Sequence, residues 1–119
     1  MTAKNNPLMD KSKAFAIRIV KMYQYLNNQK REYILSKQIL RSGTSIGANT
    51  KEAIRAFSKP DFYMKIGIAL KEASETEYWL ELLHAAGYLT SEQFNSIYPE
   101  CQELLRLLTA ICRKKDDPS

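Results

Sequence analysis

The stretch LTSEQFNSIYPECQELLRLLTAI, residues 89–111, carries the sharpest structural signals in the sequence. Thr90, followed three residues later by Gln93, is the pattern of a capping box, in which each side chain satisfies a backbone N–H at the start of a helix. Leu89 and Phe94 flank this pair and are spaced to form a hydrophobic staple. Apolar residues then recur at spacings of three and four, as in the seam of a packed helix. They are Phe94, Ile97, Cys101, Leu104, Leu108 and Ile111.

Two more helices are predicted in the first half of the chain. From Asp10, a suitable N-cap, apolar side chains recur with helical spacing over residues 10–27, and the polar residues 27–30 then favour a turn. The segment 31–57 has one continuous apolar face that extends to Phe57. We therefore expect two amphipathic helices joined by a short polar connection.

Gly43 and Gly47 both lie on the apolar face of the segment 31–57. A glycine inside a helix costs about 1 kcal/mol relative to alanine, so a compensating interaction is expected. Close approach of a neighbouring helix would supply it, because glycine has no side chain to hold the two backbones apart. The alternative is a break near Gly43, which would give two shorter helices.

The remaining helix is predicted to begin after Ser58, because Pro60 and Asp61 lie in the first turn, where both residues are favourable. It should end at Gly87, a residue typical of the position just after a helix. Four amphipathic helices with short connections predict an all-α fold, an antiparallel up-down-up-down four-helix bundle. We assign the bundle to residues 10–115, with a flexible N-terminal arm at 1–9 and a flexible tail at 116–119.

The length and composition favour one domain without a membrane span. The chain has 119 residues, of which 45% are hydrophobic, so it can build one core. No apolar run approaches the roughly 18–20 residues of a transmembrane helix, and charged residues interrupt every candidate signal peptide. We expect a cytoplasmic protein with no membrane partner. Cys101 and Cys112 lie about 16 Å apart on the last helix, too far to pair within the chain.

The residues that enzymes and metal sites require are sparse. His84 is the one histidine, and a histidine near a helix end is usually packed or interacts with the helix dipole. Glu81 and His84 form one Glu-x-x-His pair, whereas a di-metal bundle needs two such pairs and two further carboxylates. We expect no enzyme, no catalytic residue, no metal and no cofactor. The acidic residues Glu72, Glu75, Glu77 and Glu81 are expected to form a solvated face or to pair with a neighbouring subunit.

The charge is distributed unevenly along the chain. Residues 1–71 hold fourteen Lys/Arg and four Asp/Glu, whereas residues 72–119 hold four and nine. Such asymmetry suits an anionic partner, subunits that meet with opposite charges, or solvated helix faces. Part of the basic half forms a stripe opposite the apolar face of 31–57 and continues past Ser58. The candidate nucleic-acid-binding residues of this stripe are Lys37, Arg41, Lys51, Arg55, Lys59 and Lys65.

The helix after Ser58 has two apolar stripes on opposite faces, one more than a single core requires. Neighbouring helices of the same bundle could cover both. We favour self-association, because an exposed stripe that contains Trp79 is a liability on a small monomer. The candidate oligomer interface is Met64, Ile68, Trp79, Leu82 and Ala86.

Two stretches, QILRSGTSIGAN (38–49) and DFYMKIGIALKEASETEYWLELLHAAGYLT (61–90), resemble the bacterial "four helix bundle protein" family. Its founding members are 23S rRNA intervening-sequence encoded proteins. The resemblance implies an antiparallel bundle and a ring-like homopentamer with a basic surface. A related branch is the accessory protein of diversity-generating retroelements, which works with a reverse transcriptase and contacts RNA.

Together, the charge pattern and the resemblance predict a non-enzymatic oligomeric bundle that binds RNA, or a protein–RNA complex, through its basic face. Its partners would be further copies of itself, a pentamer by resemblance, and RNA or a reverse-transcriptase-like protein. The alternative is a structural or protein-interaction oligomer with no nucleic-acid role, which docks its partner through the Trp79 stripe.

Overall fold

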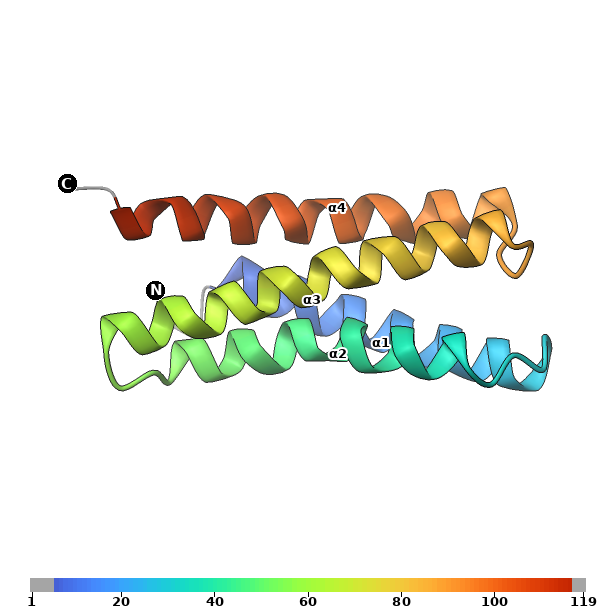
Figure 1. The fold of residues 1–119 in the computed structure, drawn as a ribbon, viewed down its shortest axis with the longest axis horizontal. Coiled ribbons are helices and arrows are strands. Elements are labelled where there is room, and N and C mark those ends of the chain that lie inside the picture. The colour runs from blue at the N-terminus through green and yellow to red at the C-terminus, as the bar shows by residue number, and fades with distance from the viewer. Residues whose placement is uncertain (1–5, 117–119) are drawn as a thin grey trace.

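Four antiparallel helices run along one axis of the molecule, which measures 48 × 23 × 20 Å (Figure 1). The computed structural model describes residues 6–116. The helices are α1 (Pro7–Asn28), α2 (Leu35–Ile54), α3 (Lys59–Ala85) and α4 (Ser91–Arg113), and the short 3-10 helix η2 (Lys114–Asp116) follows. The described part of the chain contains no strand. The predicted all-α four-helix fold is confirmed.

The first helix begins earlier than predicted. Asn6 is its N-cap, with a side-chain oxygen that accepts a hydrogen bond from Met9 N at 3.0 Å, and Pro7 occupies the first helical position, where it needs no N–H donor. The prediction of Asp10 as the N-cap is therefore wrong, and so is that of an arm reaching to residue 9. The rest of that arm, 1–5, and most of the predicted tail, 117–119, lie outside the described residues.

The connection between α1 and α2 also differs from the prediction. Asn27 still belongs to α1, and its amide donates to Ser36 Oγ at 3.1 Å in the first turn of α2. Glu32 is buried and accepts a hydrogen bond from Ser36 N at 2.7 Å, so it caps α2 from outside the helix. The chain turns at Arg31, where φ is +53°. Because of these side-chain contacts, α1 ends later and α2 begins later than the apolar periodicity of the sequence predicts.

The two glycines of α2 allow α1 to approach closely, as predicted, and α2 continues through both without a break. A β-carbon on residue 43 would lie 2.8 Å from Cγ1 of Ile19, closer than packed carbon atoms come. One on residue 47 would lie 3.3 Å from Oγ of Ser12. This contact with α1 offsets the cost of two glycines in a helix interior.

The predicted seam of α4 lies in the core. The helix begins with both hydrogen bonds of the Thr90–Gln93 capping box. Of the seam residues, those in the middle are buried, whereas Phe94 and Ile111 at its ends are partly buried. The buried ones are Ile97, Cys101, Leu104 and Leu108. Pro99 lies inside α4, and the helix continues through it.

The helices contact each other to different extents. α2 packs most extensively, against α1 on one side and α3 on the other, and α3 also packs on α4. Ser42 and Thr76 share a buried hydrogen bond of 2.8 Å between α2 and α3. Contacts between α1 and α4 are sparse and include the ion pair of Lys11 with Glu103 at 2.9 Å. In the described part of the chain, none of the helices is long and apolar enough to cross a membrane.

Replacing Gly43 with alanine should lower the free energy of unfolding by about 1–2 kcal/mol, because the new methyl group overpacks against Ile19. Gly67 in α3 is the matched control, because a β-carbon there meets no atom within 4 Å. Gly67→Ala should raise stability by about 0.5–1 kcal/mol through helix propensity. Urea unfolding of both variants measures the difference. Equal stabilisation by both would show that α1 and α2 are not in tight contact.

Candidate functional site

The predicted basic stripe divides into three parts in the structure. Lys37 lies near the start of α2 and Arg41 near its middle. The other four predicted cations, Lys51, Arg55, Lys59 and Lys65, lie where α2 ends and α3 begins, at one end of the bundle (Figure 1). We call this region the α2–α3 corner. The stripe is therefore concentrated at one end of α2.

Arg41 is engaged within the chain. Its guanidinium donates to Glu72 at 2.9 Å and also to Glu75, and both carboxylates belong to α3. Partial burial alone would lower the pKa of Arg41, but the hydrogen bond to Glu75 and the charges of both carboxylates outweigh it and raise the pKa. Two of the acidic residues expected to be solvated, or paired with another subunit, are thus partners of Arg41.

Lys65 is also paired, because its ammonium lies 3.0 Å from Glu52 on α2. The hydrogen bond to Glu52 raises the pKa of Lys65, and the charge of the same carboxylate adds to this effect. By contrast, Lys51, Arg55 and Lys59 are exposed and form no ion pair with any residue between 6 and 116. These three cations are therefore available to an anionic partner.

A cleft of about 530 Å³ opens at the α2–α3 corner. Its lining comprises Lys51, Glu52, Arg55, Phe57, Asp61 and Lys65. Phe57 is fully exposed, at 100% of its accessible surface, although the sequence predicted it on the apolar face of α2. That prediction is wrong because α2 ends at Ile54, which leaves Phe57 outside both helices. The Ser58 cap signal marks this boundary and could have excluded Phe57 from the helical face.

The predicted second apolar stripe of α3 is exposed at its ends and partly covered between them. Met64 is 61% exposed and Ile68 37% exposed, and Ala86 is also exposed. Trp79 and Leu82 are partly buried, and Trp79 packs against the core of its own chain. The indole Nε1 of Trp79 is buried without a hydrogen-bond partner among the described residues. Neighbouring helices thus cover part of this stripe.

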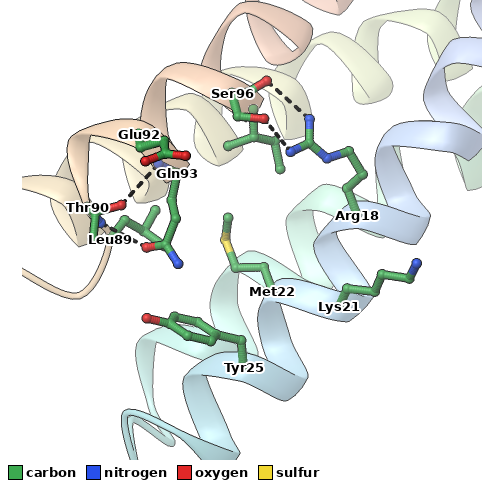
Figure 2. A pocket seen from close by; sticks show the side chains of 10 residues that line it. Arg18, Lys21, Met22, Tyr25, Leu89, Thr90, Glu92, Gln93 and Ser96 are labelled. Atoms are coloured by element: carbon green, nitrogen blue, oxygen red, sulfur yellow. Dashed lines mark hydrogen bonds between the residues drawn. The ribbon is translucent and has the colours of Figure 1, made fainter.

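A second cleft, of about 610 Å³, lies between α1 and the start of α4. Figure 2 shows Met22 and Tyr25 projecting from α1 toward the turn at Thr90. Most polar groups around this cleft already serve the fold. Arg18 donates to Ser96 and to Glu100, and the side chain of Thr90 belongs to the capping box of α4. Of the polar residues in its lining, Arg18, Thr90, Gln93 and Ser96 are thus engaged within the chain.

The titratable side chains around His84 likewise have structural partners. The imidazole stacks on Phe94, with ring centroids 4.3 Å apart, and its Nε2 lies 3.2 Å from Ser91 Oγ. The carboxylate of Glu81 accepts a hydrogen bond from the hydroxyl of Tyr98. That hydrogen bond, together with burial, raises the pKa of Tyr98. Within residues 6–116, no three His, Cys, Asp or Glu side chains gather as a metal site would require.

Comparison with known proteins identifies the family. The sequence matches the 23S rRNA-intervening sequence protein family over residues 4–110. The chain belongs to this family. A crystal structure of a protein of unknown function from the S23 ribosomal protein family of Bacteroides thetaiotaomicron has a similar fold, with a TM-score of 0.88. The two sequences are 55% identical over 89% of this chain and 98% of the other. Among curated proteins, none matches significantly.

The two cysteines differ in environment. Cys101 is buried in the core, and its thiol lies 3.5 Å from the carbonyl oxygen of Ala73. Burial raises the pKa of the Cys101 thiol to about 12, and the charges of nearby glutamates add to this. Burial also raises the pKa of Cys112, but Lys115 opposes the shift and the side chain is partly exposed. Cys101 is therefore a packing residue rather than a nucleophile.

At about pH 8, a thiol reagent should label Cys112 well before Cys101, because the thiolate is the reactive form and raising the pKa removes it. Both thiols should react at once in denaturant. In the Cys112→Ser variant, the remaining thiol should stay unmodified until the protein unfolds. If Cys101 in this variant were labelled as fast as Cys112 is in the wild-type protein, the core around Cys101 would be shown to open readily.

Proposed function

We propose that this chain is a non-enzymatic, self-associating helical bundle that binds the phosphate backbone of RNA, alone or in a protein–RNA complex. The α2–α3 corner carries the binding surface. One observation supports this proposal above the others: Lys51, Arg55 and Lys59 are exposed, close in sequence to the same helix junction, and not ion-paired within residues 6–116. Cations left free in this way can neutralise phosphates and release counterions.

The remaining cations of the predicted stripe have smaller roles in this proposal. Arg41 would have to leave two carboxylates of its own chain to contact a phosphate, and Lys65 would have to leave Glu52. Lys37 lies toward the other end of α2, away from the corner. Binding is therefore concentrated on the corner and gains affinity if self-association brings several corners together. Cations on an exposed corner favour contacts with phosphates over base-specific readout.

The comparisons favour RNA as the nucleic acid. The family description refers to 23S rRNA, and the solved relative is assigned to a ribosomal protein family. Neither description states an activity.

Charge reversal at the corner tests the proposal. Lys51→Glu combined with Arg55→Glu should weaken RNA binding at least tenfold. The slope of log affinity against log salt concentration should also become shallower, by roughly 0.7 for each phosphate that is no longer neutralised. Lys30→Glu is the matched control, because Lys30 is exposed in the α1–α2 connection at the opposite end of α2. Fluorescence anisotropy over a salt series measures both. Wild-type protein that binds no RNA at low salt would contradict the proposal.

The second candidate function is a structural or protein-interaction oligomer with no nucleic-acid role. The exposed apolar side chains of α3 favour it, since Met64 and Ile68 lie one turn apart and face solvent. Tyr78, also exposed, lies further along the same helix. The RNA-binding function proposed first also includes self-association, and the same surface of α3 would mediate it. The two functions therefore differ in RNA binding rather than in assembly.

Met64→Asp combined with Ile68→Asp should dissociate the wild-type oligomer to a 13.7 kDa chain, because both side chains are exposed and their replacement leaves the core intact. Trp79 is a poorer choice for this test, because its ring packs on the core. Ile17→Asp, an exposed position on α1, is the control and should leave the mass unchanged. Light scattering gives the masses. A monomeric wild type would remove self-association from both candidates.

A further inference from the structure

The aromatic ring of Phe57 packs against no other side chain in the described part of the fold. It lies directly before Ser58, the N-cap of α3, where a hydrophobic residue often packs on the fourth residue of the helix. That residue is Phe62, which is instead partly buried against the core and stacks edge-on with Tyr63, with ring centroids 5.1 Å apart. Since Phe57 is fully exposed, the staple is not formed. Nothing in the described part of the chain uses the ring.

The backbone that carries this ring is fixed by hydrogen bonds on both sides. Before it, Ala56 N donates to Ala53 O at 3.1 Å, which extends the end of α2. After it, Asp61 N donates to Ser58 Oγ at 3.1 Å, and Phe57 N itself donates to Asp61 Oδ2 at 3.3 Å. The ring is therefore presented from an ordered turn, which lowers the entropy cost of binding a ligand against it.

The cleft beside the ring has room and charge for a nucleotide. Its volume of about 530 Å³ falls within the range of small-ligand sites. Both carboxylates in its lining are engaged, Glu52 with the ammonium of Lys65 and Asp61 with the N–H of Phe57. Lys51 and Arg55 remain available in the same lining. A phosphate in the cleft could thus meet two cations while a base covers the ring.

From this arrangement we propose that the α2–α3 corner recognises single-stranded RNA, with an unpaired base stacked on Phe57 and the neighbouring phosphate held by Lys51 and Arg55. The inference rests on the proposed function and names the form of RNA that the corner takes. An aromatic face accepts any unpaired base, since every base has a π-face. In a duplex the bases are already stacked on one another, so the ring gains nothing there. The cations around the ring favour an anionic partner over an apolar protein surface.

The test compares Phe57→Leu with wild-type protein on two ligands that carry the same number of phosphates, a single-stranded oligouridine and a blunt RNA duplex. Phe57→Leu should weaken single-strand binding roughly 5- to 100-fold and leave duplex binding unchanged. Tyr33→Leu, which removes an exposed aromatic ring from the α1–α2 connection at the opposite end of α2, is the matched control and should change neither. Phe57→Trp should bind the single strand about as tightly as wild-type protein does. The fluorescence of the introduced indole should be quenched by oligouridine but not by an abasic strand.

The possible results separate the two proposals. If Phe57→Leu binds both ligands like wild type while the Lys51→Glu, Arg55→Glu variant binds neither, the stacking role is wrong and the phosphate-binding function stands. If wild-type protein binds neither ligand, both proposals fail. If Phe57→Leu changes the mass in light scattering but not the affinity for the single strand, the ring contacts a second copy of the chain, and the inference is overturned.

Discussion

Ile19 of α1 lies over Gly43 of α2 so closely that a β-carbon at that position would come within 2.8 Å of it. This contact, repeated one turn later between Ser12 and Gly47, sets the distance between the first two helices. Because α2 packs on α1 with one side and on α3 with the other, its position also determines where α3 lies. The α2–α3 corner, with its free cations and exposed ring, depends on this placement.

The antiparallel arrangement of α2 and α3 explains which cations remain available. Residues that lie about equally far from the turn between the two helices face each other, and this brings Arg41 to Glu72 and Glu75. It also brings Lys65 to Glu52. Three cations of the basic half are paired with glutamates of the acidic half, namely Lys11, Arg18 and Arg41. Exposed ion pairs of this kind contribute little to stability, so their larger effect is on which charges a partner meets.

The sequence predicted the number and type of the helices well, because that information is local. The capping box at Thr90 and the cap at Ser58 each depend on residues within one turn, and both are present. The start of α2 was mispredicted because it depends on the Glu32 side chain, which lies outside the helix and is buried against it. The position of Phe57 was mispredicted because apolar periodicity does not show where a helix stops.

The sequence by itself determined four amphipathic helices, the close approach at the two glycines, and an excess of cations in its first half. Each follows from spacing, capping chemistry or composition. Only the tertiary structure decided which cations are paired and that Trp79 packs on the core. It also decided that the ring of Phe57 is exposed beside a charged cleft. The reason is physical: pairing and exposure depend on the register between helices, and register is set by contacts between residues far apart in the chain.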